Sequence, residues 1–512
     1  MLIEDLRKYM EENGIDYFYI NTADEYLLEY NDMETCFRYA MTGFSGSMGE
    51  ALLTNEKLYL FVDGRYHTQA DIETNPQFVE VVKLGMGEGH LQKIAEIVEN
   101  DKTFALIAKT VALKTFEQLQ KKLKDKNIKY IKLDRNPVFN PDKKQSISHI
   151  NYFKIGLSQE EKIQKLNLKE NEAILVNALD EIAYFTNLRS FDIPFSSSFY
   201  AKMIVENGKI NLFTNGEIKE KPQNTTIYPL NEFESFLTSL NKTIIFSKND
   251  INLHNYELIK NNCREVSPSL IETMKSVKTD DELEYIKECY KKTDIAVNKA
   301  KELIEGNKDV TEADLAEFIA NAFKETGAKA QSFTPIAAFG KNSAIIHYKD
   351  YDNSKNLEVG EFVLLDCGAY WEGGFASDIT RTFHRGELSD EQKMIYEAVK
   401  KAHLKVLNST FDEPPTAFEL DKIARDMLKE YEQYGYKFSH SLGHGVGINV
   451  HEHPPVLSPL ETSKQPLKEN MVFTIEPGLY KEGAGGVRLE NSVYMKYENG
   501  KYCFKSLSFV DM

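Results

Sequence analysis

The chain has 512 residues, which is more than one hydrophobic core usually holds, so two to four domains are expected. Its formal net charge of −17 argues against nucleic acid as a partner, because phosphate-binding surfaces are basic. Apolar residues make up 42% of the sequence, but they form no long uninterrupted run, so we expect a water-soluble protein without a membrane span. The five cysteines are scattered, and the first residues lack the apolar core of a signal peptide, which together predict a cytoplasmic protein with reduced thiols.

Residues 1–135 are predicted to form a first α/β unit. Residues 15–20 read as a buried strand, residues 51–54 and 57–62 as a hairpin, and residues 105–108 as a further strand. The unit carries no complete nucleophile-elbow or phosphate-loop motif.

Residues 136–268 are predicted to form a second unit, which begins with the polar connection 136–148. The hairpin formed by residues 201–205 and 209–216, with its turn at Asn207-Gly208, parallels the hairpin of the first unit. Two copies of one α/β unit are the simplest explanation of this repetition.

Asp180 and Glu181 are adjacent carboxylates in the amphipathic stretch 178–189 of the second unit. Such a pair could act as a general acid and base, but we expect it to lie on the solvated face of a helix.

Residues 269–512 are predicted to form the third unit, in which helices alternate with strands. Capping boxes at Thr279 and Ser389 begin two helices, and further helices are expected at residues 311–326 and 416–435. The strands between them end at candidate metal ligands. Side chains that project from a sheet are held rigidly, as a metal site requires.

Two aspartates stand on either side of a glycine-containing turn in this unit. Asp366 ends the apolar run 362–366, and Asp378 follows Gly373-Gly374. If the turn closes an antiparallel hairpin, the strands lie about 5 Å apart and both carboxylates could hold one cation.

Three further candidate ligands follow. His444 lies in a glycine-rich segment, and Glu476 and Glu490 each end an apolar run. Singly, each of the five residues could be a turn cap or an ordinary core residue. Together they carry a charge of about −4, which two divalent ions would neutralise.

The donor types restrict the metal. Carboxylates are hard ligands and imidazole is intermediate, so the set favours Mn, Co, Fe or Zn, and the lack of thiolates speaks against a structural zinc. Cys367, which follows Asp366 on a predicted strand, would point to the opposite face. Two ions about 3.5–4 Å apart can bridge a water molecule and make hydroxide available near pH 7.

The order of the ligands, Asp, Asp, His, Glu, Glu, and the sequences of residues 378–382, 443–447 and 476–478 resemble those of the dinuclear-metal aminopeptidases of the pita-bread fold. Within them the chain is most similar to the three-domain form of aminopeptidase P, the Xaa-Pro aminopeptidases. The resemblance implies an α/β (α+β) fold with two creatinase-type N-terminal domains before a pita-bread catalytic domain. The implied domains are residues 1–135, 136–268 and 269–512.

The resemblance also implies roles for the five ligands of two divalent ions. Asp366 would bind one ion, Asp378 and Glu490 would bridge both, and His444 and Glu476 would complete the other. Mn²⁺ is expected first, with Co²⁺, Fe²⁺ and Zn²⁺ as alternatives. Glu476 would also act as general base and acid, passing the proton of the attacking water to the leaving amine.

Three histidines match catalytic positions of the family, namely His347, His440 and His451. They would orient the substrate and stabilise the tetrahedral oxyanion, a role typically worth ~3 kcal/mol. Arg488, two residues before Glu490 and on the same strand face, could hold the ligating carboxylates.

The expected reaction removes the N-terminal residue from peptides with proline in second position, by a metal-bridged hydroxide. A prolidase with dipeptide substrates is the first alternative, and the repeated N-terminal units weigh against it. A catalytically inactive, peptide-binding relative is the second, and the complete ligand set weighs against it. A homodimer, as in many relatives, is left open.

One departure from the family concerns the spacing of the two aspartates. They are twelve positions apart, from 366 to 378, where the family usually has about eleven. We expect the extra residue to be absorbed in the turn at residues 371–375, as a bulge that leaves the ligands in place.

Overall fold

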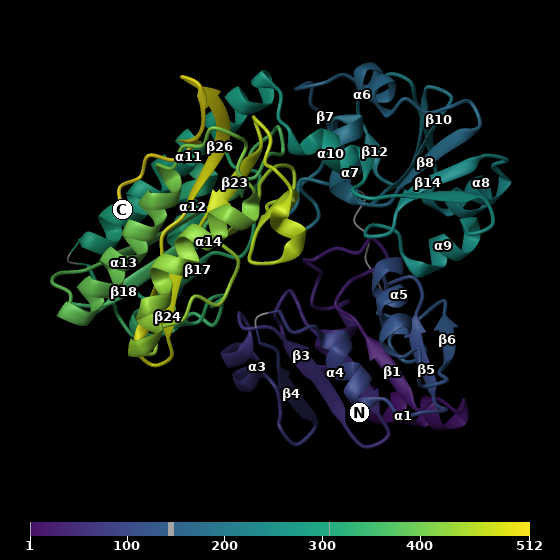
Figure 1. The fold of residues 1–512 in the computed structure, drawn as a ribbon, viewed down its shortest axis with the longest axis horizontal. Coiled ribbons are helices and arrows are strands. Elements are labelled where there is room, and N and C mark those ends of the chain that lie inside the picture. Colours follow the sequence, from purple (N-terminus) through teal and green to yellow (C-terminus); the bar gives the residue numbers. More distant parts are fainter. Residues whose placement is uncertain (1, 86, 142–147, 307) are drawn as a thin grey trace. The chain divides into compact units, whose positions relative to one another are not determined.

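The computed structural model describes residues 2–85, 87–141, 148–306 and 308–512. Residues 142–147 of the predicted connection 136–148 therefore lie outside the described residues. The chain divides into two compact units, which are described one at a time (Figure 1). The first unit comprises Met1–Ile150, Gln159–Thr186 and Phe199–Leu270, and the second comprises Asn151–Ser158, Asn187–Ser198 and Ile271–Met512.

The first unit contains two six-stranded sheets. The first sheet has the order β4-β3-β2-β1-β5-β6, in which β1, β2 and β3 are antiparallel neighbours and the outer strands are added in parallel. The predicted hairpin and the two predicted strands are all present. The strands are β1 (Tyr17–Ile20), β2 (Glu50–Thr54), β3 (Leu58–Val62), β4 (Val79–Lys83), β5 (Thr103–Ile107) and β6 (Lys129–Leu133), and the helices are α1 (Leu2–Glu12), α2 (Phe37–Thr42), α3 (His67–Glu73), α4 (His90–Ile97) and α5 (Leu113–Lys122).

The second sheet repeats this topology. Its order is β13-β11-β10-β8-β14-β15, with antiparallel neighbours in the middle and parallel strands added outside, as in the first sheet. The predicted second hairpin, β10 with β11, occupies the place that β2 with β3 has in the first sheet, which confirms the repetition. The strands are β8 (Glu172–Val176), β10 (Lys202–Glu206), β11 (Lys209–Phe213), β13 (Thr225–Tyr228), β14 (Thr243–Ser247) and β15 (Cys263–Val266), with the short strand β12 (Glu217–Ile218). Strand β7 (His149–Tyr152) runs from the first unit into the second, and β9 (Leu188–Arg189), which pairs with its end, belongs to the second unit.

The helices of this second half are α6 (Gln159–Leu166), α7 (Leu179–Thr186), α8 (Phe233–Ser239) and α9 (Leu253–Ile259). Apolar side chains from both sheets, among them Phe104, Ile204 and Phe246, belong to one buried cluster. The two sheets of the first unit therefore share a hydrophobic core, which apolar burial stabilises.

Glu181 corrects one expectation of the sequence. It lies on α7, but its side chain is buried and accepts a hydrogen bond of 3.0 Å from the Ser269 hydroxyl, whereas Asp180 is half-buried. The expected solvated face is therefore wrong for Glu181. The buried hydroxyl that it contacts lies 88 positions away and leaves no local sequence signal.

Four capped helices define the second unit. They are α11 (Asp280–Glu305), α12 (Glu312–Glu325), α13 (Asp390–Leu407) and α14 (Ala417–Leu428), and each begins with a capping box, including the two predicted at Thr279 and Ser389. The helix expected up to residue 435 is shorter, because α14 gives way to the 3₁₀ turn η3 (Lys429–Tyr434), which ends at Gly435 with φ 83°. α10 (Leu270–Ser276) precedes them.

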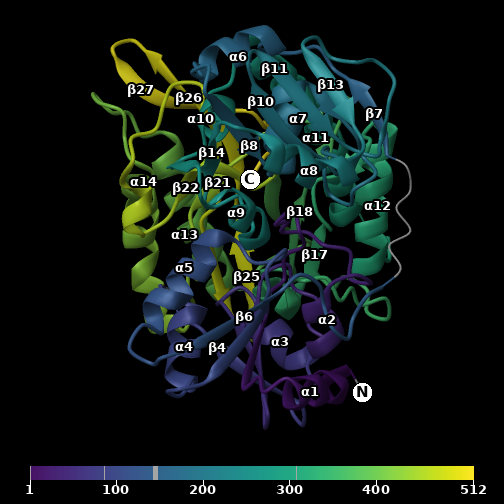
Figure 2. The same ribbon diagram turned by 90° about the vertical axis from the view of Figure 1, so that its right-hand side faces the viewer.

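Apart from β9 and the end of β7, the strands that the structure describes in the second unit form two larger sheets and two strand pairs. The sheets have the orders β17-β18-β20 and β22-β21-β23-β26-β27, and β24 pairs with β25 and β16 with β19. α12 packs against β17 and α14 against β22, and Figure 2 shows these helices on opposite sides of the strands. The strands are β16 (Ala330–Gln331), β17 (Ile336–Phe339), β18 (Phe362–Cys367), β19 (Ala369–Tyr370), β20 (Ile379–His384), β21 (Gly443–Gly445), β22 (Glu452–Leu457), β23 (Val472–Ile475), β24 (Gly478–Lys481), β25 (Gly485–Arg488), β26 (Asn491–Glu498) and β27 (Lys501–Ser506).

No helix within the described residues has the length and apolar character needed to cross a membrane.

The cap of α13 generates a test of the second unit's stability. The Ser389 hydroxyl accepts a hydrogen bond of 3.3 Å from the Gln392 amide, so Ser389→Ala should lower the free energy of unfolding by ~1 kcal/mol. Trp371 is the only tryptophan and is 1% exposed, so its fluorescence during urea unfolding reports on this unit. Ser389→Asp, which keeps an acceptor at the cap, is the control; equal losses in both variants would contradict the assignment.

Candidate active site

Strands β18 and β20 are antiparallel neighbours, as predicted, and Asp366 lies on β18. Asp366 is paired with Thr380, and Asp378 directly precedes β20, so the carboxylates are offset by two positions and do not lie directly opposite each other. The ladder runs without a register shift to the pair Cys367–Ile379. The connection 368–378 contains the turn at residues 371–375, and the absorption of an extra residue there stays a prediction. Cys367 belongs to a buried apolar cluster, in agreement with its predicted orientation.

The other three candidate ligands come from neighbouring strands. His444 lies on β21, between two glycines that allow close packing. A Cβ atom on Gly443 would lie 2.1 Å from the Thr474 carbonyl oxygen, and one on Gly445 would lie 2.4 Å from the Glu452 carbonyl oxygen. Both positions therefore require glycine. The two glutamates border β23 and β26, which pair with each other.

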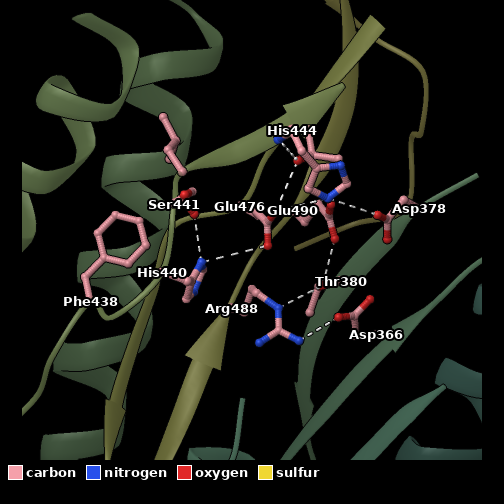
Figure 3. Close-up of polar contacts among 12 residues, drawn as sticks. Asp366, Asp378, Thr380, Phe438, His440, Ser441, His444, Glu476, Arg488 and Glu490 are labelled. Carbon is pink, nitrogen blue, oxygen red and sulfur yellow. Dashed lines mark hydrogen bonds and ion pairs between the residues drawn. The ribbon is translucent and has the colours of Figure 1, made fainter. Parts of the chain in front are cut away.

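Four of the five predicted ligands lie close together, with three carboxylates around the imidazole of His444 (Figure 3). The ligand atoms of Asp378, His444 and Glu490 all lie within 4.8 Å of one another. His444 Nε2 lies 3.5 Å from Asp378 Oδ2 and 3.4 Å from Glu476 Oε1. Residues more than a hundred positions apart in the sequence thus form one compact cluster.

Asp366, the fifth predicted ligand, is joined to the cluster by Arg488. Arg488 Nη2 donates a hydrogen bond of 2.6 Å to Asp366 Oδ2, and Arg488 Nε donates one of 3.2 Å to the Thr380 hydroxyl. The Thr380 hydroxyl in turn donates to Glu490 Oε2 at 2.7 Å. The buried guanidinium therefore orients a carboxylate directly and a second one through Thr380, as expected for Arg488.

The charges of the cluster repel one another in a site that is largely buried. Burial, and after it the charge of Glu490, raises the pKa of Asp378 well above its usual range. Burial, and after it the charges of Glu476 and Asp366, does the same for the pKa of Glu490. Burial raises the pKa of Glu476 to about 7, although Arg488 opposes the shift. Without bound cations, each negative charge in this cluster lowers the free energy of unfolding.

Two unsatisfied oxygens test whether divalent ions fit. Asp366 Oδ1 and Glu490 Oε1 are buried and have no hydrogen-bond partner among the described residues. Buried carboxylate oxygens normally have partners, so these two lone-pair acceptors indicate ligands to cations. The donor set of carboxylates and one imidazole fits hard or intermediate divalent ions.

The three histidines that were predicted to be catalytic lie in three different surroundings. His440 Nδ1 lies 2.8 Å from the Ser441 carbonyl oxygen and 4.0 Å from Glu476 Oε2, and His440 Nε2 lies 2.8 Å from the Tyr480 hydroxyl. The His451 ring packs edge-on against the His444 ring, with centroids 4.5 Å apart. His347 is half-buried in the turn after the 3₁₀ turn η2 (Gly340–Ala344), which packs against β18 and β25.

Two further residues of the site were missed by sequence reasoning. Thr380 bridges Arg488 and Glu490, and Tyr480 accepts a hydrogen bond of 2.9 Å from Arg488 Nη1 while contacting His440. Thr380 stands two positions after Asp378, so strand alternation could have placed it on the same face. Tyr480 has no comparable signal, because its partners come from other parts of the chain.

The raised pKa of Glu476 predicts how metal-free protein responds to pH. A carboxyl group whose pKa is higher in the folded state stabilises the fold below its usual value of 4.5, and this contribution is lost as the pH rises towards 7. Chelated protein should therefore lose thermal stability between these pH values. Protein with added Mn²⁺ should not, so the difference between the two Tm values should widen with pH. A difference that stays constant in calorimetry would contradict the cluster.

Comparison with known families divides the sequence into three matched regions. Residues 3–135 and 140–282 each match the creatinase/prolidase N-terminal domain, and residues 284–497 match metallopeptidase family M24.

Similar proteins share nearly the whole chain. A probable Xaa-Pro aminopeptidase P of Pyrenophora teres f. teres is 28% identical, over 98% of this chain and 82% of the relative. Xaa-Pro aminopeptidase 1 of Dictyostelium discoideum is 27% identical, over 98% of this chain and 86% of the relative.

Solved structures agree with this match. The X-prolyl aminopeptidase of Caenorhabditis elegans, described as a cytosolic enzyme with a di-nuclear active site, is 25% identical with a TM-score of 0.89, covering 97% of this chain and 87% of that one. A dipeptidase from Pyrococcus horikoshii is 26% identical with a TM-score of 0.56, covering 69% of this chain and 98% of that one. Residues 284–497 thus form a peptidase region of metallopeptidase family M24, with the pita-bread fold, and two creatinase-type N-terminal domains precede it.

Proposed function

We propose that this protein is an Xaa-Pro aminopeptidase, which hydrolyses the bond between the first residue of a peptide and a proline in second position. The cluster of Asp378, His444, Glu476 and Glu490 carries the proposal, because it provides the ligands and the acid–base group of a metallopeptidase. The names of relatives that match nearly the whole chain support the substrate. A cytoplasmic location and a homodimer stay predictions.

We infer that five residues hold two divalent ions. When bound, such ions act as Lewis acids and lower the pKa of a water molecule towards neutrality. Mn²⁺ is the ion that we expect first, with Co²⁺, Fe²⁺ and Zn²⁺ as alternatives that the same donor set accepts. The ligands are Asp366, Asp378, His444, Glu476 and Glu490.

Glu476 is proposed as the group that moves the proton. Its two oxygens face His444 and His440, at 3.4 Å and 4.0 Å, so the carboxylate lies inside the cluster (Figure 3). It would take a proton from the attacking water and give it to the amine of the leaving proline.

We propose that the three histidines have different roles in the reaction. His440 has both ring nitrogens within hydrogen-bond distance of chain atoms, and since a carbonyl only accepts, Nδ1 donates to Ser441 and Nε2 accepts from Tyr480. We therefore expect His440 to fix the orientation of its neighbours. His451 and His347 remain the candidates for contacting the scissile carbonyl and its oxyanion.

A prolidase is the second candidate. The matched dipeptidase covers 69% of this chain, whereas the C. elegans aminopeptidase covers 97%, so the second N-terminal domain favours the aminopeptidase. An inactive peptide-binding relative would not need to keep the full set of ligands.

Substrate length separates the two enzymes. Purified protein with Mn²⁺ should release the first residue from Xaa-Pro-Xaa peptides and leave Xaa-Ala-Xaa peptides intact. Activity confined to Xaa-Pro dipeptides would establish the prolidase. A protein that binds no divalent ion after addition of Mn²⁺, as measured by elemental analysis, would establish the inactive relative.

Replacement of the proton-transfer group gives a direct test. Glu476→Gln should lower kcat by roughly two to four orders of magnitude, because the amide cannot accept the proton. The far-ultraviolet circular dichroism spectrum should stay that of the wild type. Glu498→Gln is the matched control, since Glu498 is half exposed and pairs with Lys505 far from the cluster in the ladder. Full turnover in Glu476→Gln would refute the role.

A further inference from the structure

Glu452 is a buried carboxylate that the proposed reaction does not use. It follows His451 and is 2% exposed. Its Oε1 lies 3.2 Å from Lys275 Nζ, and its Oε2 accepts a hydrogen bond from Lys278 Nζ. Both lysine side chains are themselves almost completely buried. Three ionisable groups thus meet in the interior of the second unit.

The contacts keep the carboxylate ionised. Burial acts to raise the pKa of Glu452, but the charges of Lys275 and Lys278 outweigh it, so the pKa lies below its usual value. An ion that loses its water needs close partners in good geometry, and removal of one partner leaves an uncompensated buried charge. Each member of the triad is therefore needed by the other two.

The chain before Glu452 is wrapped around this carboxylate. Glu452 Oε1 accepts a hydrogen bond of 3.1 Å from the Ile448 amide. A Cβ atom on Gly447 would lie 2.2 Å from Glu452 Oε1, so a larger residue there would displace the carboxylate from its present position. The wrapped segment begins with His444 and ends with His451, whose rings lie 4.5 Å apart. Glu452 thus holds the backbone at Gly447 and Ile448, between the two histidines.

Lys278 is held by the backbone on either side of the connection from α10 to α11. Its Nζ also donates to the Lys275 carbonyl oxygen, in α10, at 2.7 Å, and its amide donates to the Asn470 carbonyl oxygen at 3.1 Å. Val277 forms a bridge with Met471 just ahead of β23, the strand that leads to Glu476. Lys278 is therefore anchored beside the same sheet that carries the histidine segment.

By sequence, both lysines stand before the start of the metallopeptidase match at residue 284, within the range matched by the second N-terminal domain. By packing, they belong to the second unit, which begins again at Ile271. The peptidase region alone therefore lacks the cations that compensate its own buried Glu452.

We propose that Lys275 and Lys278 are positioning residues of the active site, which act through Glu452 to hold the segment 443–452 with its two histidines. The inference rests on the proposed function for the roles of His444 and His451. It assigns to the segment before the peptidase region a part in forming the metal centre.

The test uses the full chain with Lys278→Met and Glu452→Gln, and Lys291→Met as the matched control, since Lys291 is 65% exposed and pairs along its helix with Glu288. We expect each of the first two variants to bind Mn²⁺ roughly 10–100-fold more weakly, as found for residues that orient metal ligands. Because both act through one contact, the double variant should be no weaker than the worse single variant. Lys291→Met should match the wild type.

Hydrogen exchange of metal-free protein provides a readout that does not depend on activity. Lys278→Met should speed exchange in residues 443–453 and leave the sheets of the first unit unchanged. If Lys278→Met is not obtained as folded protein, Lys275→Met is measured in the same way. A lower Tm with wild-type Mn²⁺ affinity and wild-type exchange in 443–453 would overturn the inference, because the triad would then be purely structural. Faster exchange in a chain whose wild type binds no Mn²⁺ would support the positioning and refute the proposed function.

Discussion

The mutual repulsion of buried carboxylates is the constraint on which the rest of the second unit depends. Asp378, Glu476 and Glu490 all have raised pKa values, with burial as the largest cause. Arg488 is the cation that contacts Asp366 directly, and one guanidinium cannot balance four carboxylates. Bringing such groups together costs free energy, which protonation or bound cations would lower. This cost is the reason that we propose a metal centre here and expect the stability of the fold to depend on bound metal.

Rigid strands hold these charges against their repulsion. Each carboxylate of the cluster stands at or beside the end of a paired strand, and His444 is placed by glycines that let β21 approach its neighbours. Glu452, Lys275 and Lys278 form a second buried cluster, in which opposite charges compensate one another without metal. The second unit thus contains one cluster of like charges, which we propose to bind metal ions, and another whose opposite charges compensate one another.

The first unit shows how repetition builds a fold. Both sheets have the same order and the same mixture of parallel and antiparallel neighbours, and apolar side chains from both enter one core. The repeated hairpin could be predicted because a strand–turn–strand pattern is local. The common core could not, because it joins side chains about a hundred positions or more apart, such as Phe104 and Ile204.

The amino-acid sequence by itself determined the local features and the chemistry of the ligands. Capping boxes such as that at Thr279, hairpins and strand ends depend on neighbours within a few positions, and they appear where the pattern predicts them. Only the tertiary structure decided which side chains meet. Glu181 is buried against Ser269, Tyr480 links Arg488 to His440, and Glu452 meets Lys278 from 174 positions away. Such contacts follow from the packing of whole elements, and local periodicity contains no record of them.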